Sequence, residues 1–303
     1  MLSIEPSGNV LGATITGLDL SEPLGDRNLA EIILALGRFG FVRFPRQNLT
    51  SPALKSLAEC FGEVPLSVTR GESEEVPGVG ILSNIIIDGK PIGKPDAGLM
   101  WHTEMSYGST IGYVNVLYAL EVPQRAGKPL GGTEFINTRA AYDDLAPAIQ
   151  ARIEHLSATH DVQNYWDHAR DMGSNRPAFS SEHRLTKPLV SHPMVMKHPV
   201  TDASFLYCNS GFTVRVNGLA DAESERLLGE LFEHQSQPRY RCLYEWTVGD
   251  VLIWDNLGTQ HRAIADYGPD EHRLMKRCQV KSDKIFDPRF LQKLFRATAA
   301  AHG

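Results

Sequence analysis

The sequence predicts one domain that is mostly β, with helices on its flanks. Short apolar runs bounded by glycine and other turn formers recur along the 303 residues, which is typical of strands. Apolar residues at helical spacing are confined to a few segments. No internal repeat, low-complexity segment or linker divides residues 1–303, so we expect a single domain.

The first part of the chain alternates predicted strands with two predicted helices. Strands are expected up to Leu20 and over residues 41–44. A helix is expected to follow Asp26 as its N-cap, and a second to begin at Thr50 or Ser51. The first helix has apolar residues at spacings of three, four and seven: Leu29, Ile32, Ile33 and Leu36. We expect both helices to cover a sheet.

The middle of the chain contains the longest irregular segments. Residues 64–100 predict loops around one strand at 79–85, and a strand is expected over 113–122. A helix is predicted from Thr138, continuing past Pro147. Residues 163–187 are polar and without period, and we interpret them as a lid or insertion.

The last third predicts strands and one clear helix. Strands are expected over residues 193–196 and 205–208, followed by a helix capped by Asp221. Two further strands, 250–256 and 273–280, are predicted with a loop between them. That loop carries Gln260, His261 and Arg262.

Composition favours a small-molecule partner. The net charge of −6 gives no basic surface for nucleic acid, and no Lys/Arg cluster points to a membrane. No apolar run approaches the ~20 residues that cross a bilayer, and the first residues do not resemble a signal peptide, so we expect a cytoplasmic protein. The cysteines are far apart and predict reduced thiols: Cys60, Cys208, Cys242 and Cys278.

The motif that carries chemistry is residues 101–106, WHTEMS. In an extended segment, His102 and Glu104 lie on one face while Thr103 turns away. An imidazole and a carboxylate on one face can bind one metal ion, but a third ligand is needed. His261 is the best candidate because it follows a predicted strand and precedes two arginines.

The other histidines have simpler explanations. Two lie on predicted helices, three in strand or turn contexts and three in polar segments: His155 and His234; His160, His192 and His198; His168, His183 and His272.

Two imidazoles and one carboxylate on one face of an octahedron leave three positions open, which suits Fe(II) enzymes that bind a chelating cosubstrate and oxygen.

The chain resembles the taurine/2,4-dichlorophenoxyacetate dioxygenase family of Fe(II)- and 2-oxoglutarate-dependent oxygenases. The resemblance runs nearly end to end and rests on these motifs: LSI at 2–4, GATITGLDL at 12–20, FGE at 61–63, WHTE at 101–104, GGT at 131–133, NSGFT at 209–213, WDN at 254–256, TQH at 259–261, DY at 266–267 and RLMKR at 273–277. It implies a double-stranded β-helix, or jelly roll.

The resemblance also implies residue roles. Iron would be held by His102, Glu104 and His261. Arg273 would pair with the distal carboxylate of 2-oxoglutarate, helped by the hydroxyl of Thr133. Arg277, on the same strand face as Arg273, would meet a substrate anion or 2-oxoglutarate itself. Further candidate substrate contacts are Phe212, Tyr107, Ser67 and Asn84.

Two departures from the family pattern bear on chemistry and substrate. Glu104 stands where the family usually has Asp, although related oxygenases resembling clavaminate synthase use H-x-E. A carboxylate of either length argues against halogenation. Taurine-type enzymes place a histidine shortly after the FGE motif, and residues 64–68, VPLSV, have none, which makes taurine itself doubtful.

We therefore expect hydroxylation, or another C–H oxidation, of a small anionic substrate such as an amino acid or organic acid. Fe(II), 2-oxoglutarate and O2 would be required, and succinate and CO2 released. The family implies a homodimer or homotetramer. Two alternatives remain open: a zinc-dependent hydrolase, which would leave Arg273 and Thr133 without a role, and a non-catalytic jelly-roll binding protein.

Overall fold

The computed structural model describes residues 2–66, 76–95, 98–174 and 176–299. Its largest element is a seven-stranded sheet in the order β1, β2, β3, β17, β7, β19, β4. Neighbouring strands are antiparallel except β2 and β3, which are parallel. The strands are Ser3–Pro6 (β1), Ala13–Thr16 (β2), Phe41–Phe44 (β3), Val251–Asp255 (β17), Gly112–Glu121 (β7), Leu274–Lys281 (β19) and Gly80–Ser83 (β4).

A three-stranded sheet packs against one face of the large sheet. Its order is β16 (Arg241–Tyr244), β10 (Thr133–Asn137) and β18 (Thr259–Ala263), all antiparallel. Buried side chains from both sheets form one cluster that includes Leu117, Phe135 and Trp254. This apolar layer holds the two sheets together and, as described below, borders the candidate site.

Helices α1 (Asp26–Phe39), α2 (Ser51–Glu59) and α8 (Pro288–Ala299) cover the other face of the large sheet. Leu36, Leu57 and Leu294, one from each helix, belong to the same buried cluster as residues of β7, β17 and β19. Thr50 caps α2 by accepting a hydrogen bond from the Ala53 N–H, as predicted. The N-cap of α1 is Gly25, one residue before the predicted Asp26.

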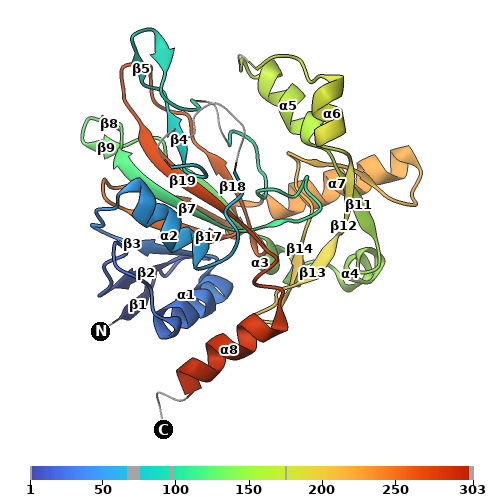
Figure 1. The fold of residues 1–303 in the computed structure, drawn as a ribbon. Helices are drawn as coiled ribbons and strands as arrows, with labels where there is room; N and C mark the ends of the chain where they lie inside the picture. Colours follow the sequence, from blue (N-terminus) through green and yellow to red (C-terminus); the bar gives the residue numbers. More distant parts are fainter. Residues whose placement is uncertain (1, 67–75, 96–97, 175, 300–303) are drawn as a thin grey trace.

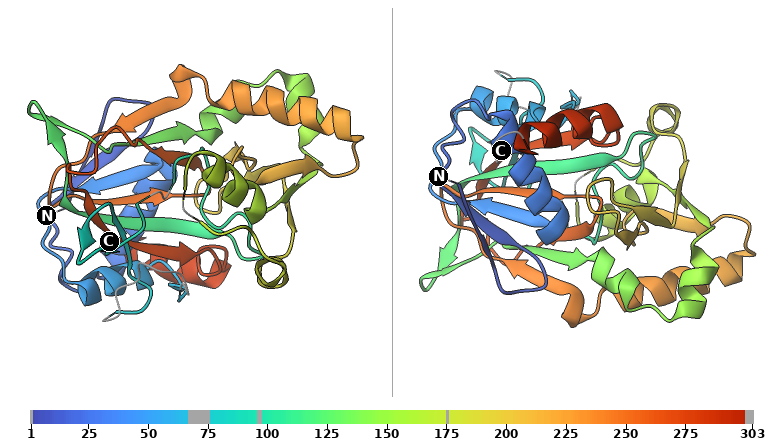
Figure 2. Two further views of the ribbon diagram at one scale, coloured as in Figure 1. Left: turned by 90° about the horizontal axis from the view of Figure 1, so that it is seen from above. Right: turned by 90° about the horizontal axis from the view of Figure 1, so that it is seen from below.

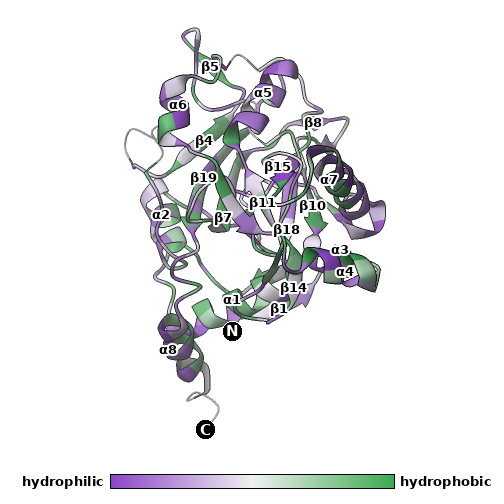
Figure 3. Ribbon diagram, turned by 90° about the vertical axis from the view of Figure 1, so that its right-hand side faces the viewer, coloured by the Kyte–Doolittle hydropathy of each residue, from purple (hydrophilic) through white to green (hydrophobic). Residues whose placement is uncertain are grey.

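The remaining elements extend the molecule beside the two sheets. They are α3 (Thr138–Asp143), α4 (Pro147–Ile153), β11 (Ser157–His160), α5 (Val162–Asp171), α6 (Ser181–Thr186), β12 (Val190–Pro193), β13 (Val195–Lys197), β14 (Ser204–Leu206), β15 (Thr213–Val216), α7 (Asp221–Gln235) and the 3-10 turn η1 (Pro238–Tyr240). Helices α3, α4 and α7 share a second core with β11, β14 and β15. Figure 3 shows that α5 and α7 are largely hydrophilic on the sides seen there.

Short hairpins complete the described chain: β5 (Ile86–Ile87) with β6 (Lys90–Pro91), and β8 (Gln124–Arg125) with β9 (Lys128–Pro129). Helices α5 and α6 lie at one end of the molecule, opposite α8 (Figures 1 and 2). Ser67, one of the predicted substrate contacts, lies outside the described residues.

Two predictions of secondary structure were wrong. Residues 260–262 were expected in a loop and form the centre of β18. Residues 163–187 were expected to be irregular and contain most of α5 and all of α6. In β18 the buried residues Thr259, Gln260 and His261 are polar, so apolar alternation does not reveal the strand.

Smaller differences concern helix ends. The helix predicted from Thr138 is capped by Asn137, whose side chain accepts from the Ala140 N–H, and it stops before Pro147, where α4 begins. Asp221 is the first residue of α7, and Ala220 is its N-cap. A proline cannot donate the hydrogen bond that would continue α3, so two helices form instead of one.

Candidate active site

The two predicted histidine ligands are joined through their backbones. His102 pairs with His261 of β18 in an antiparallel bridge, with N···O distances of 3.1 and 2.9 Å. Their ring centroids are 4.2 Å apart. Because β18 is fixed between its neighbour β10 and this bridge, both imidazoles are carried by hydrogen-bonded backbone rather than by a free loop.

Glu104 brings a carboxylate to the same point. Its Oε1 lies 3.6 Å from His102 Nε2 and 3.8 Å from His261 Nε2, and all three residues are buried. The convergence was predicted, but Glu104 lies in a turn rather than in an extended strand. Met105 directly after it has φ +60°, a left-handed conformation that is uncommon for residues other than glycine.

The chemistry of these donors fits a divalent metal ion. Ligand atoms of His102, Glu104 and His261 lie within 4.8 Å of one another. His102 Nδ1 is 2.8 Å from the Met100 carbonyl oxygen and can donate a hydrogen bond to it. Nε2 then carries the free electron pair that can bind a metal. Burial, with the neighbouring His102, lowers the pKa of His261, which favours the neutral imidazole that metals bind.

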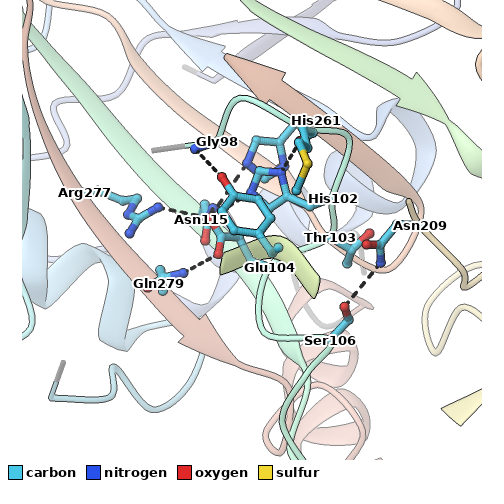
Figure 4. Close-up of polar contacts among 12 residues, drawn as sticks. Gly98, His102, Thr103, Glu104, Ser106, Asn115, Asn209, His261, Arg277 and Gln279 are labelled. Atoms are coloured by element: carbon cyan, nitrogen blue, oxygen red, sulfur yellow. Dashed lines mark hydrogen bonds and ion pairs between the residues drawn. The ribbon is translucent and has the colours of Figure 1, made fainter. Parts of the chain in front are cut away.

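Three donors on β7 and β19 surround the Glu104 carboxylate (Figure 4). Asn115 Nδ2 and Arg277 Nη1 donate to Oε1 at 3.2 and 3.0 Å, and Gln279 Nε2 donates to Oε2 at 2.6 Å. Burial opposes the charged form, but Arg277 and the two histidines outweigh it and hold the pKa of Glu104 well below its usual value. Glu104 is therefore a carboxylate.

Arg273 is a buried cation without an acidic partner among the residues that the structure describes. Its Nε donates to the Gly131 carbonyl oxygen at 3.2 Å, and burial lowers the pKa of its guanidinium. It lines a cleft together with His102, Glu104 and His261. A desolvated guanidinium facing a cavity is the donor set that a carboxylate ligand would satisfy.

Thr133 lines the same cleft, and its hydroxyl is oriented by Trp246. The Trp246 indole N–H donates to Thr133 Oγ1 at 3.0 Å. A hydroxyl that accepts one hydrogen bond keeps its own proton for another acceptor. Thr133 is thus prepared to donate toward a ligand beside Arg273.

Gly131 allows the close approach of Arg273. Its φ is +69°, and a Cβ at this position would lie 2.9 Å from both Cδ and Nε of Arg273. The GGT motif therefore supplies the conformation, the space and the hydroxyl of this part of the cleft.

Comparison with known proteins places this geometry in a family. The family described as "Taurine catabolism dioxygenase TauD, TfdA family" matches residues 3–279. The chain belongs to the TauD/TfdA family. Pentalenolactone F synthase from Streptomyces arenae is 30% identical over 292 residues, covering 92% of this chain and 94% of that protein.

Solved structures of TauD/TfdA-type proteins share the fold. A putative α-ketoglutarate-dependent 2,4-D dioxygenase from Burkholderia xenovorans has a TM-score of 0.78 and 28% identity, covering 94% of this chain and 99% of its own. AAD-2 in complex with Mn(II) and N-oxalylglycine has a TM-score of 0.76 and 25% identity, covering 93% and 97%. The expected jelly roll is confirmed.

The TauD/TfdA assignment also decides the class of enzyme. The protein is a non-haem iron dioxygenase that uses Fe(II), 2-oxoglutarate and O2. A zinc hydrolase, the first alternative, would have left Arg273 and Thr133 without a role. Within the described residues, no helix is both long and apolar enough to span a membrane.

Two of the predicted substrate residues, Phe212 and Tyr107, lie beside the candidate metal ligands of the TauD/TfdA site, and a third, Asn84, is bound to backbone groups. Phe212 lies edge-on to His102 at 6.0 Å between ring centroids, and Tyr107 packs on Phe212 at 4.9 Å. Asn84 is occupied by backbone: its Nδ2 donates to Gly268 and Glu271, and its Oδ1 accepts from the Arg273 N–H. The structure thus places Asn84 behind Arg273, where it fixes the start of β19.

Sequence reasoning missed four residues of the site. Asn115, Gln279 and Trp246 hold predicted residues in place, and Tyr165 of α5 contacts His102 at 5.6 Å between ring centroids. Strand periodicity from Arg277 could have indicated Gln279, two residues on. The sequence carries no comparable signal for the other three, because their contacts depend on how the strands and α5 pack together.

Proposed function

We propose that this protein oxidises a C–H bond of a small organic anion, with 2-oxoglutarate converted to succinate and CO2. The observation that carries the proposal is the buried guanidinium of Arg273, which has no acidic partner among the described residues and lines the same cleft as His102, Glu104 and His261. Three metal ligands beside a cation that can bind a carboxylate fit a cosubstrate that chelates the metal and carries two negative charges.

His102, Glu104 and His261 would hold the metal, and Arg273 with Thr133 would bind the distal carboxylate of 2-oxoglutarate. Bound iron supplies the activation of O2 that C–H oxidation requires. The residues of this chain orient the cosubstrate and limit access of water. Leu82, Leu117 and Trp254 line the cleft and make its wall apolar, which strengthens the contacts of Arg273.

A second cation supports an anionic substrate. Lys187, just after α6, is half-buried, and its Nζ lies 5.0 Å from the ring centroid of Tyr107. No acidic partner faces it among the described residues. Arg277, the other candidate, already binds Glu104 at 3.0 Å. The aromatic residues Tyr107 and Phe212 connect Lys187 to His102, so the substrate would place its anionic group toward Lys187 and an apolar body along these rings.

Binding of the metal and the cosubstrate is tested without turnover. Fe(II) and 2-oxoglutarate are added anaerobically to the whole protein, and the visible charge-transfer band of the metal–ketoacid chelate is recorded. We expect the band with the wild-type chain and its loss in His261→Ala. A folded wild-type protein that gives no band would contradict the proposal.

The substrate class is tested by succinate release. Aromatic and aliphatic carboxylates, sulfonates, sulfate esters and amino acids are screened alongside neutral analogues of the same shape. We expect anions to stimulate succinate release over the substrate-free rate, and Lys187→Met to raise their KM while leaving the KM for 2-oxoglutarate unchanged. Equal stimulation by the neutral analogues would overturn the anionic part of the proposal.

A further inference from the structure

We propose that Asn115 and Gln279 are positioning residues for Glu104, and that together with Arg277 they form a cradle matched to glutamate rather than aspartate. These three residues are called the Glu104 cradle below. The inference rests on the proposed role of Glu104 as a metal ligand. It explains why the third residue of the H-x-E motif is glutamate, although aspartate would carry the same charge.

The cradle is built across two neighbouring strands. β7 and β19 pair antiparallel, and Gln279 lies directly opposite Asn115 in their register. Arg277 precedes Gln279 by two residues and therefore projects from the same face of β19. The three donors form one patch, and all point to the carboxylate of Glu104 (Figure 4).

The hydrogen bonds leave little freedom to the carboxylate. Arg277 and Asn115 donate to Oε1, and Gln279 donates to Oε2. An ionised carboxylate has about four acceptor directions, so three donors leave about one. The remaining acceptor direction is on Oε2, and the cradle holds the carboxylate with Oε1 3.6 and 3.8 Å from the Nε2 atoms of His102 and His261.

The length of the side chain is matched to this cradle. Aspartate would withdraw the carboxylate by about 1.5 Å, the length of one carbon–carbon bond. The backbone is restrained from following, because Glu104 packs so closely on Gly112 of β7 that there is no room for a Cβ at Gly112, and because His102 is held in the bridge to His261. Asn115, which is fully buried, would lose its acceptor.

A double-mutant cycle on metal affinity tests the cradle. Mn(II) binding to the purified full chain is measured by electron paramagnetic resonance, without turnover, for wild type, Gln279→Leu, Glu104→Asp and the double variant. Gln279→Leu should weaken Mn(II) binding about 10- to 100-fold. Glu104→Asp should weaken binding clearly in the wild-type background and only slightly when Gln279 is already leucine.

The controls separate positioning from folding. Lys281→Met lies on the same strand but contacts Glu63 rather than Glu104, and should leave Mn(II) affinity unchanged. Asn115→Leu gives a parallel cycle, which decides the question if Gln279→Leu does not fold. Additive effects in a folded cycle would overturn the cradle while the proposed function stands. A folded wild-type protein that binds no Mn(II) would overturn both.

Discussion

Two charged residues of the site have opposite surroundings. Glu104 is surrounded by donors, so its charge is compensated within the protein. Arg273 has one backbone acceptor for its side chain and no carboxylate among the described residues, so its charge is left for a ligand. A buried ion without a partner is costly to the fold, and binding of an anion would remove that cost.

Replacing Arg273 by leucine should therefore weaken 2-oxoglutarate binding. Losing charge-assisted hydrogen bonds worth about 1.5–3 kcal/mol predicts a rise in the KM for 2-oxoglutarate of about 10- to 100-fold. Succinate release at varied 2-oxoglutarate measures it. Arg241→Leu is the matched control, because it removes an arginine of β16 that pairs with Glu134 of β10, and it should leave this KM unchanged. An unaltered KM in Arg273→Leu would assign the carboxylate to another residue.

At the scale of elements, α5 and α6 convert the predicted lid into a defined structure. Asp161 caps α5 by accepting from the Gln163 N–H, and its carboxylate also binds both terminal nitrogens of Arg184 on α6 at 3.0 Å. Tyr165 of α5 contacts His102, and its hydroxyl accepts from the Gly98 N–H. The segment is thus tied both internally and to the site.

Removing the link between α5 and α6 should loosen α6. In Arg184→Met the bidentate pair with Asp161 is lost, and α6, which buries none of its residues, keeps the ring contacts of His183 with Trp166 and Phe179. We expect faster limited proteolysis within residues 172–188 and a raised substrate KM, with the KM for 2-oxoglutarate unchanged. Arg170→Met, at an exposed position on α5, is the control. Identical cleavage rates for the two variants would show that the ion pair does not hold the segment.

At the scale of the whole molecule, a second buried histidine cluster affects stability. His160 is fully buried, and its ring lies 5.2 Å from that of His192 and 5.9 Å from that of Tyr207. Burial, with a contribution from His192, lowers the pKa of His160 to about 3 from 6.5. Between these values the unfolded chain binds more protons than the folded one, so stability rises with pH and is lost as pH falls.

Replacing His160 by glutamine should reduce this dependence on acid. The free energy of unfolding, measured by urea at several pH values between 7 and 4, should fall less steeply in the variant. Below pH 6 the slopes of the two curves should differ by about 1.4 kcal/mol per pH unit, which corresponds to one proton bound on unfolding. His168→Gln, at an exposed position on α5, is the control. Parallel curves for wild type and His160→Gln would refute the assignment.

Much of the fold could be predicted because local patterns agree with it. Helices α1, α2 and α7 have apolar residues at helical spacing, and strands β7 and β17 are largely apolar runs. Strand β18 could not be predicted in this way, because its buried residues are polar. The short helix α6 was missed because it buries none of its residues.

The sequence by itself determined the candidate residues: His102, Glu104 and His261 were proposed from residue types and spacing. Thr133 and Arg273 were implied by the family resemblance, and the structure brings all five to one cleft. Only the tertiary structure decided what holds them. Asn115 lies opposite Gln279, which is 164 residues further along the chain. Trp246, between β16 and β17, donates a hydrogen bond to Thr133. Such partners depend on strand register, which is set by the packing of the two sheets and has no local signature in the sequence.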